Sequence, residues 1–318
     1  VLSLSSSQFN SNNAQSGGAI YVEVDPSVKV SLSSSKAQYK SNKAIAKDDN
    51  AYGGAIYTET YITDNKSNYL SNTVTANSDT DDVYGNGGAV YINSAISPNS
   101  KSLNKFTSTT FYGNIASDNG GAIYVTTRDF NPLFNTGVIN ITLNKTVFGS
   151  TNSLKPGNIA YNGGAVYSEI AKVTMTSAKF INNSATNNGG AFYNDTYSNL
   201  TLTKDTFGNA DKKGLTLAPN TAARGGAIYN KGIINVKTGN TFAGNNAVQG
   251  GAIYSTMSDD TSILSFVTIT KANFNYNSAV AKSGYESLDT IGGAIYNDAS
   301  TVIKSAKFNG NKDRKSVV

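Results

Sequence analysis

A short tandem repeat runs through the whole chain and limits what it can fold into. Gly-Gly-Ala, then Ile, Val or Phe, then Tyr, occurs nine times in the 318 residues. The last position is a tyrosine in every copy, at Tyr21, Tyr57, Tyr91, Tyr124, Tyr167, Tyr193, Tyr229, Tyr254 and Tyr296. Self-similarity at a period of about 20 to 50 residues is typical of solenoids and other repeat architectures. We therefore expect stacked copies of one unit rather than a single globular core.

A second motif, an aromatic residue followed three positions later by Asn, alternates with the first. The aromatic positions are Phe9, Tyr39, Tyr69, Phe111, Phe148, Phe180, Phe207, Phe242, Phe274 and Phe308. The asparagines are Asn12, Asn42, Asn72, Asn114, Asn183, Asn245, Asn277 and Asn311. Phe148 and Phe207 have no Asn at that spacing. An apolar residue lies five positions before most of the aromatics, often with another two earlier, which is the period of a β-strand.

The spacing of the motifs sets the size of the repeat. Phe242 precedes Gly250 by 8 residues and Gly53 precedes Tyr69 by 16, so the shortest unit has about 24 residues with three strand signals. An α-solenoid would need helical periodicity, and a propeller blade would need four strands in about 40 residues. The sequence therefore predicts an all-β fold, a parallel β-helix of about ten three-stranded coils, in a single domain over residues 1–318. The longer spacings are interpreted as loops inserted into a fixed coil.

Each motif has a physical role in such a coil. The aromatic side chains are predicted to point inward and to stack on those of the next coil, about 4.8 Å away. The asparagines are predicted to lie at a corner, where their amides can bond to each other and to backbone groups of the turn. One glycine of each pair is expected at positive φ at another corner. In the tyrosine motif, strand alternation directs Ile toward the core and Tyr outward.

The paired GGAI and FxxN motifs resemble the polymorphic membrane protein repeat of chlamydial outer-membrane proteins. The copies that carry the resemblance are GGAIY at Gly17, Gly53, Gly120, Gly225, Gly250 and Gly292, with FNSN at Phe9, FINN at Phe180 and FAGN at Phe242. The Asn-rich, cysteine-free repeats also look like those of adhesin-like proteins of methanogenic archaea. The resemblance implies a right-handed β-helical passenger, display at the cell surface or outer membrane, and an adhesive role. Chlamydial members are usually richer in Cys than this chain, which has none.

The absence of His, Cys and Trp excludes several mechanisms. Disulfides, thiolate or imidazole catalysis, and His or Cys metal sites are all ruled out. The net charge of +5 comes from 26 Lys and Arg against 21 Asp and Glu, and the basic residues are scattered with no evident stripe. We expect a solvated lysine surface and no nucleic-acid partner, because sequence readers favour clustered Arg. The chain has no apolar run long enough to span a membrane.

Clustered carboxylates are the remaining candidates for chemistry. They are Asp48 and Asp49; Asp79, Asp81 and Asp82; and Asp259 and Asp260, all in the inserted loops. Polysaccharide lyases and hydrolases need converging carboxylates or a Ca²⁺ cluster. We favour solvated loop charges over Ca²⁺ binding, and Ca²⁺ binding over catalysis. The sequence therefore predicts no enzyme activity, no catalytic residue, no metal site and no cofactor, with loop Ca²⁺ kept as an alternative.

Three functions compete. The favoured one is a non-catalytic adhesin or surface-structure protein, part of a longer surface protein, that attaches to a protein or glycan of a host or neighbouring cell. The alternative is an extracellular filament or sheath subunit that stacks head to tail, because the chain starts and stops within a coil and both ends would be open edges. A β-helical polysaccharide lyase or hydrolase ranks last.

The nine tyrosines of the repeat form the candidate binding surface. An outward ladder of rings either shields one sheet, which we favour, or offers a flat aromatic track to a glycan or partner protein. Both interpretations place the rings on the outer face of the coil.

Overall fold

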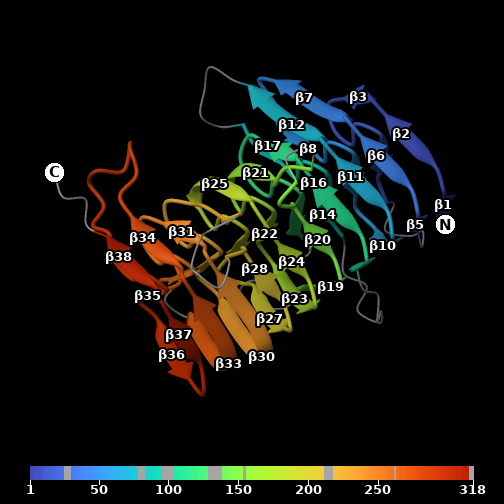
Figure 1. Cartoon of the computed structure of the whole chain (residues 1–318). Coiled ribbons are helices and arrows are strands. Elements are labelled where there is room, and N and C mark those ends of the chain that lie inside the picture. The colour runs from blue at the N-terminus through green and yellow to red at the C-terminus, as the bar shows by residue number, and fades with distance from the viewer. Residues whose placement is uncertain are drawn as a thin grey trace.

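The structure, a computed structural model, consists of short parallel β-strands wound into a solenoid (Figure 1). It describes residues 1–24, 30–77, 83–94, 104–127, 138–152, 155–210, 218–260 and 263–314. The strands lie side by side in coil order, and the two chain ends lie at opposite ends of the stack (Figure 1). Across these residues there is no α-helix, and hence none long and apolar enough to cross a membrane.

Sheet 1 has eighteen strands and contains both the apolar and the aromatic positions of the repeat. Its strands are β1 (Leu2–Ser5), β2 (Gln8–Asn10), β5 (Ser31–Ser35), β6 (Gln38–Lys40), β10 (Tyr61–Asn65), β11 (Asn68–Leu70), β15 (Asn104–Thr107), β16 (Thr110–Tyr112), β19 (Ile139–Asn144), β20 (Val147–Phe148), β23 (Ala171–Thr176), β24 (Lys179–Phe180), β27 (Asn199–Thr203), β28 (Thr206–Phe207), β30 (Ile233–Ala243), β33 (Phe266–Asn275), β36 (Ser300–Ile303) and β37 (Lys307–Asn309). Most coils contribute two strands separated by a kink, and in β30 and β33 the two are continuous.

Sheet 2 follows the asparagine corner and has three parts. Its strands are β3 (Asn13–Ala14), β7 (Lys43–Lys47), β12 (Thr73–Asn77), β17 (Ile115–Ala116), β21 (Ile159–Asn162) and β25 (Ser184–Asn188), then the pair β8 (Ala51–Tyr52) and β13 (Gly85–Asn86), and the trio β31 (Asn246–Ala247), β34 (Ser278–Val280) and β38 (Lys312–Arg314).

Sheet 3 has nine strands, and each begins at the residue before a repeated tyrosine. They are β4 (Ile20–Val22), β9 (Ile56–Thr58), β14 (Val90–Asn93), β18 (Ile123–Thr126), β22 (Val166–Ser168), β26 (Phe192–Asn194), β29 (Ile228–Asn230), β32 (Ile253–Ser255) and β35 (Ile295–Asn297).

Strand pairing is parallel, with equivalent residues of successive coils opposite each other. Phe148 pairs with Phe180 and Phe180 with Phe207, although the loops between these coils differ in length. The predicted all-β parallel β-helix is therefore confirmed. Eight complete turns join the nine strands of sheet 3, with a partial turn on either side, so the expected count of about ten coils was slightly high.

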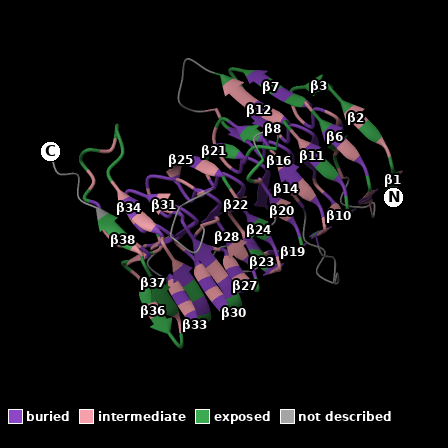
Figure 2. Cartoon of the chain, viewed as in Figure 1, coloured by how far each residue is buried: buried purple, intermediate pink, exposed green. Residues whose placement is uncertain are grey.

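The aromatic positions form one continuous stack inside the solenoid, as predicted. From Phe9 to Phe308, successive ring centroids lie 4.6 to 5.1 Å apart and the ring planes differ by 2 to 10°. The eight inner rings are completely buried, whereas Phe308 is 49% exposed. Figure 2 shows the same gradient, with buried residues in the middle coils and exposed ones on β1 and β36.

The asparagines form a second ladder, and it is more complete than the sequence indicated. Each Asn amide donates to the side-chain oxygen of the Asn in the next coil, as from Asn42 to Asn72 at 2.9 Å, and also to the carbonyl of the aromatic residue of the preceding coil, as from Asn72 to Tyr39 at 3.0 Å. Asn158 and Asn220 fill the rungs beside Phe148 and Phe207. The two rungs that had no Asn at the expected spacing are therefore present.

The Gly-Gly pairs lie at the corner before sheet 3. The first glycine has positive φ, for example 66° at Gly189, as predicted. The second glycine is required for a different reason, because a Cβ on Gly190 would lie 2.2 Å from the carbonyl oxygen of Gly226 in the next coil. Backbone therefore packs directly on backbone at this corner.

Candidate functional site

The nine repeated tyrosines stack along the outer side of sheet 3. Neighbouring ring centroids lie 4.4 to 5.5 Å apart from Tyr21 to Tyr296, with planes within 2 to 23°. The residues that precede them, such as Ile56 and Phe192, are completely buried in the main core. Tyr57, Tyr91 and Tyr124 belong to a separate cluster. The predicted alternation, Ile inward and Tyr outward, is confirmed.

Most rings of this column are buried, which suits the favoured interpretation of a ladder that shields the sheet better than an exposed aromatic track. The side chains of Tyr57, Tyr91, Tyr124 and Tyr229 are each 7% exposed, and Tyr193 is 6% exposed. Tyr167, Tyr254 and Tyr296 are half-buried, and Tyr21 alone of the nine is exposed, at 53%. Stacking covers both faces of each inner ring, so only ring edges could reach a ligand.

Side chains from other elements cover part of the column. The ring centroid of Tyr52, which precedes a Gly-Gly corner, lies 4.5 Å from that of Tyr91 and 6.2 Å from that of Tyr57. Tyr52 is not part of either motif, and no periodic pattern in the sequence predicts it. Its effect is to close the outer face of the column in the first coils.

Carboxylates accept hydrogen bonds from several hydroxyls of the column. Tyr57 donates to Glu59 Oε1 at 3.0 Å and Tyr124 to Glu169 Oε2 at 2.8 Å. These contacts satisfy hydroxyls that would otherwise be buried without a partner. Burial first, and the nearby carboxylate Glu169 second, raise the pKa of Tyr124 well above its ordinary value. The phenols therefore stay protonated and remain donors at neutral pH.

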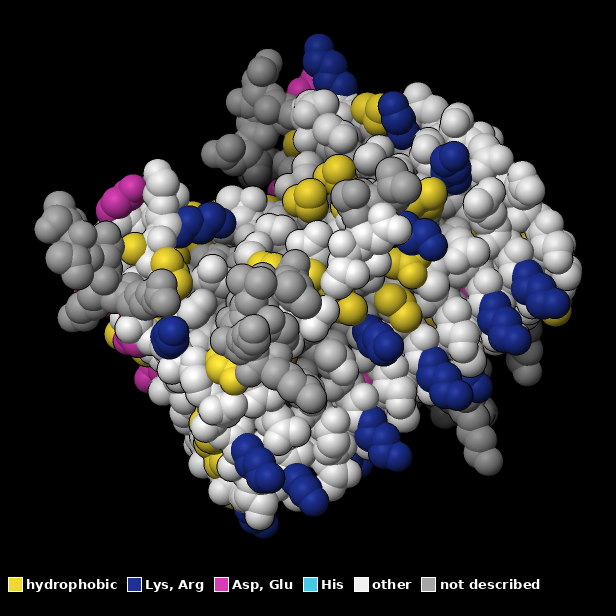
Figure 3. All heavy atoms as spheres, in the orientation of Figure 1, with side chains coloured by type: hydrophobic (Ala, Val, Ile, Leu, Met, Phe, Trp, Pro, Cys, Tyr) yellow, Lys and Arg dark blue, Asp and Glu magenta, His cyan; other side chains and the backbone are white. Residues whose placement is uncertain are grey.

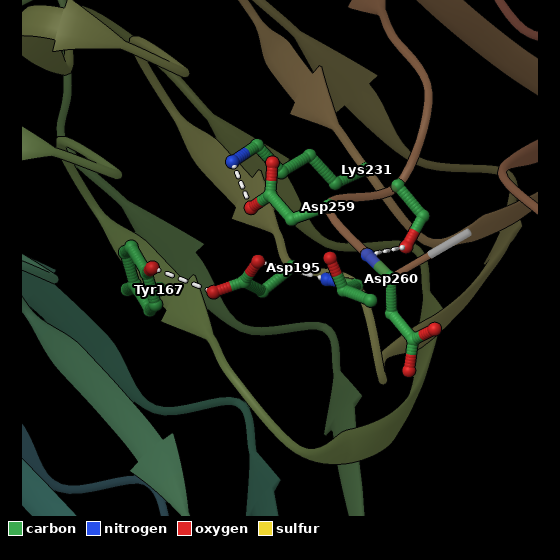
Figure 4. Close-up of polar contacts among 7 residues, drawn as sticks. Tyr167, Asp195, Lys231, Asp259 and Asp260 are labelled. Atoms are coloured by element: carbon green, nitrogen blue, oxygen red, sulfur yellow. Dashed lines mark hydrogen bonds and ion pairs between the residues drawn. The ribbon is translucent and has the colours of Figure 1, made fainter. Parts of the chain in front are cut away.

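An acidic cleft of about 410 Å³ lies beside the column, where the chain leaves sheet 3 (Figure 4). Tyr167 donates to Asp195 Oδ2 at 2.8 Å, and the backbone N–H of Thr196 donates to Asp195 Oδ1 at 2.8 Å. Burial raises the pKa of the Asp195 carboxyl, and the hydrogen bonds from Thr196 and Tyr167 oppose that shift. Lys231 forms an ion pair with Asp259 at 2.5 Å.

The carboxylates of this cleft have structural partners. Asp195 holds the hydroxyl of Tyr167, and Asp260 accepts from the hydroxyl of Tyr197 at 2.8 Å. In the part of the chain that the structure describes, no three Asp or Glu side chains are placed to hold a metal ion. Asp79, Asp81 and Asp82 lie outside the described residues. Loop Ca²⁺ binding therefore stays a prediction.

Two features were missed in the sequence interpretation, although the sequence carries a signal for both. Asn158 and Asn220 each begin an Asn-x-Ala triplet, and the same triplet occurs at Asn12, Asn42 and Asn183. Aligning the coils by this triplet, instead of by the distance from the aromatic residue, would have identified both asparagines. Glu169 and Asp195 also carry a signal, because Glu or Asp follows the repeated tyrosine by two positions at Glu23, Glu59, Glu169, Asp195 and Asp298.

Two segments of the chain match a known family model. Residues 108–126 and 177–195 match the model of the Chlamydia polymorphic membrane protein repeat. These segments are similar to that repeat, as the motifs suggested. Each runs from the kink of sheet 1 through the aromatic stack, the Asn ladder and the Gly-Gly corner to the tyrosine column. The Chlamydia proteins are associated with the cell surface and outer membrane, so the match supports a surface location. No curated protein and no solved structure is a significant match to the chain.

Proposed function

We propose that this chain is a non-catalytic, adhesin-like rod of a cell-surface protein. The observation that carries the proposal is the pair of matches to the polymorphic membrane protein repeat, because each matched segment is close to one turn of the solenoid and the same turn recurs along the chain. Stacked turns produce an extended surface with a fixed spacing, which is how solenoid proteins present binding faces.

The arrangement of charged groups is consistent with a binding protein rather than with catalysis. The phenols of the tyrosine column are held as hydrogen-bond donors by carboxylates. Asp64 and Asp205, the two acidic residues within sheet 1 and its kinks, are buried, and their hydrogen bonds go to the solenoid's own groups. These carboxyls stabilise the coil and are not available to a substrate.

Adhesion can be measured directly with the chain as it is. Beads coated with residues 1–318 are expected to adhere to bacterial, archaeal or animal cells more strongly than beads coated with albumin. Beads carrying the Phe180→Ala/Phe207→Ala variant, in which the central stack is broken, serve as the unfolded control. Equal adhesion of the folded chain and albumin across the whole panel would contradict the proposal.

Head-to-tail assembly, the alternative function, stays a prediction. Its test is negative-stain electron microscopy of the purified chain at increasing concentration. Unbranched rods whose length grows with concentration would favour the filament, and single short rods at all concentrations would remove it.

A further inference from the structure

The kinks of sheet 1 bring together lysines that look scattered in the sequence. The residue at the kink in successive coils is Ser6, Lys36, Lys66, Ser108, Lys145, Ser177, Lys204, Gly239, Lys271 and Ser305. Their alignment is fixed by backbone hydrogen bonds between coils, for example from Lys66 N to Thr107 O and from Lys145 N to Thr176 O, both at 2.9 Å. We call these ten residues the kink column.

From Lys66 onward, lysine occupies every second position of the kink column, and the positions between are Ser108, Ser177, Gly239 and Ser305. Because successive coils lie about 4.8 Å apart, the backbone positions of consecutive lysines are about 10 Å apart. Lys66, Lys145, Lys204 and Lys271 are all exposed. Among the described residues, no carboxylate forms an ion pair with them.

The backbone conformation at the kink makes this choice of residues unexpected. Lys66 has φ of 61°, Lys145 of 52° and Lys204 of 59°, which is the left-handed region that Gly and Asn favour. A side chain with a Cβ costs about 1 to 2 kcal/mol there. Other coils have Ser or Gly at the same kink, as at Ser108 and Gly239. The backbone therefore accepts small residues at this kink and does not itself require lysine there.

The rest of the same face is basic and hydrophilic. Lys105, Lys172, Lys179 and Lys237 are exposed on strands of sheet 1. Between them, the outward positions are mostly Ser, Thr or Asn. The two carboxyls within the sheet and its kinks, Asp64 and Asp205, are completely buried. Figure 3 shows a row of Lys and Arg side chains, and few acidic ones, along the side where Figure 1 draws these strands.

We propose that the kink column binds an extended acidic polysaccharide in which a charged sugar alternates with a neutral one. One sugar of an extended chain spans about the same distance as one coil, so each lysine would meet a uronate or sulfate group and each Ser or Gly between them a neutral sugar. The polysaccharide lies on the outer surface of sheet 1, parallel to the solenoid axis, and crosses the kink of each successive coil. This inference rests on the proposed adhesive function and names its ligand class.

The composition of the face favours a polysaccharide over other polyanions. It has no exposed Arg among its described residues, whereas Arg is the preferred bidentate partner of phosphate. Its outward positions between the lysines are mostly Ser, Thr or Asn, and the outward aromatic residues Tyr61, Tyr112 and Phe266 are half-buried and are poor platforms for nucleobases. Hydroxyls and amides are suitable hydrogen-bond partners for sugar hydroxyls.

The first test removes the charge of the alternating lysines. The variant is Lys66→Gln/Lys145→Gln/Lys204→Gln/Lys271→Gln, and the probe is a fluorescent hyaluronan oligosaccharide, which alternates a uronate with a neutral amino sugar. Exposed ion pairs contribute about 0.2 to 1 kcal/mol each, so the four changes together are expected to weaken binding about tenfold or more. Binding by the unchanged chain should also weaken steeply as salt is added.

A matched control makes the same change in net charge elsewhere. Lys43→Gln/Lys47→Gln/Lys155→Gln/Lys282→Gln alters four exposed lysines outside sheet 1 and should leave affinity within about twofold of the unchanged chain. Circular dichroism confirms that both variants are folded. Equal loss in the two variants, or tighter binding of RNA or of anionic lipid vesicles than of hyaluronan by the unchanged chain, would overturn the proposal.

A second test changes the period of the charge. Ser108→Lys/Ser177→Lys places a lysine at each kink from Lys36 to Lys204, and the left-handed conformation already accepts lysine at this kink. The variant should shift preference from hyaluronan toward oligogalacturonate, which has a carboxylate on every sugar. An unchanged ratio of the two affinities would show that spacing plays no part, and would contradict the proposal.

The bead assay separates this inference from the adhesive function itself. If beads carrying the four lysine changes adhere to cells as well as wild-type beads but do not bind hyaluronan, the adhesive function would stand and the ligand class would be rejected. Hyaluronan binding by beads that do not adhere to any cell would retain the site and reject the adhesive function.

Discussion

Asn158 donates a hydrogen bond from Nδ2 to Oδ1 of Asn183 at 2.9 Å, although residues 149–157 separate Asn158 from the aromatic position of its own coil. In the next coil, Asn183 lies only three positions after Phe180, the aromatic residue of strand β24. The corner therefore keeps its geometry when a loop is inserted before it. Ladder hydrogen bonds between coils, rather than local spacing, decide where the amide lies.

Removal of one asparagine from this ladder should lower the free energy of unfolding substantially. Asn183→Ala removes the side-chain oxygen that accepts two hydrogen bonds from Asn158. It also removes the amide that donates to Phe148 O and Asn220 Oδ1, and the whole site is completely buried. Each unsatisfied buried partner costs about 1 to 3 kcal/mol, so we expect a loss of about 3 to 5 kcal/mol in the free energy of unfolding. Denaturant titration measures it. The control, Asn65→Ala on an exposed strand position, should change stability by less than about 0.5 kcal/mol.

The burial of the tyrosine column changes the expected cost of truncating it. From the sequence alone, Tyr193→Ala would cost much less than Phe180→Ala, because Tyr193 was placed on an open outer face. Tyr193 is instead stacked between Tyr167 at 4.4 Å and Tyr229 at 4.8 Å. We now expect about 2 to 4 kcal/mol for Tyr193→Ala and about 3 to 5 kcal/mol for Phe180→Ala. A cost below about 1 kcal/mol for Tyr193→Ala would show that the column is open in solution.

Asp205 should make stability depend on pH near neutrality. Burial raises the pKa of its carboxyl from 3.8 to about 7, against the opposing hydrogen bonds from the N–H groups of Ala178 and Thr203. Folding therefore favours the protonated form. Its contribution is fully present below about pH 4 and is lost as pH rises through about 7.

Asp205→Asn should flatten this part of the pH profile. The variant loses one acceptor at every pH, so the comparison is of slopes and not of absolute stabilities. Between pH 5 and pH 8, the free energy of unfolding should fall by roughly 1 to 3 kcal/mol more in the unchanged chain than in the variant. Parallel profiles from denaturant titrations would mean that Asp205 is ionised in the folded chain throughout this range.

The Gly-Gly corner gives a test of backbone packing. The Cβ of Gly190→Ala would lie 2.2 Å from Gly226 O and 2.6 Å from Thr221 N, and neither backbone atom can move without opening the ladder. A loss of about 3 kcal/mol or more in unfolding free energy is expected. Gly284→Ala is the control, because nothing lies within 4 Å of its Cβ and only its φ of 86° opposes the change. Similar losses at the two positions would contradict close packing at the corner.

The periodic features of the fold could be predicted from the sequence, whereas burial and contacts between coils could not. Phe180, Asn183 and Gly189 recur at nearly constant spacing, so their roles follow from the repeat alone. The burial of Tyr193 depends on its stacked neighbours, which alternation along a single strand does not reveal. The kink column was missed because lysine occupies only some of the positions three before the aromatic residues, and the others are Ser or Gly.

The central claim is that each turn adds one coil to a single stack regardless of how many residues it contains. The chain has no Cys, so spin labels can be attached at engineered cysteines. Thr63, Thr142 and Thr268 occupy equivalent outward positions in sheet 1, with Thr142 and Thr268 four coils apart and Thr63 and Thr268 six. Pulsed electron–electron double resonance should give a distance between the labels of about 19 Å for the pair Thr142→Cys/Thr268→Cys and about 29 Å for Thr63→Cys/Thr268→Cys. Distances that do not increase by about 4.8 Å per coil would contradict the stack on which the tyrosine column and the kink column both depend.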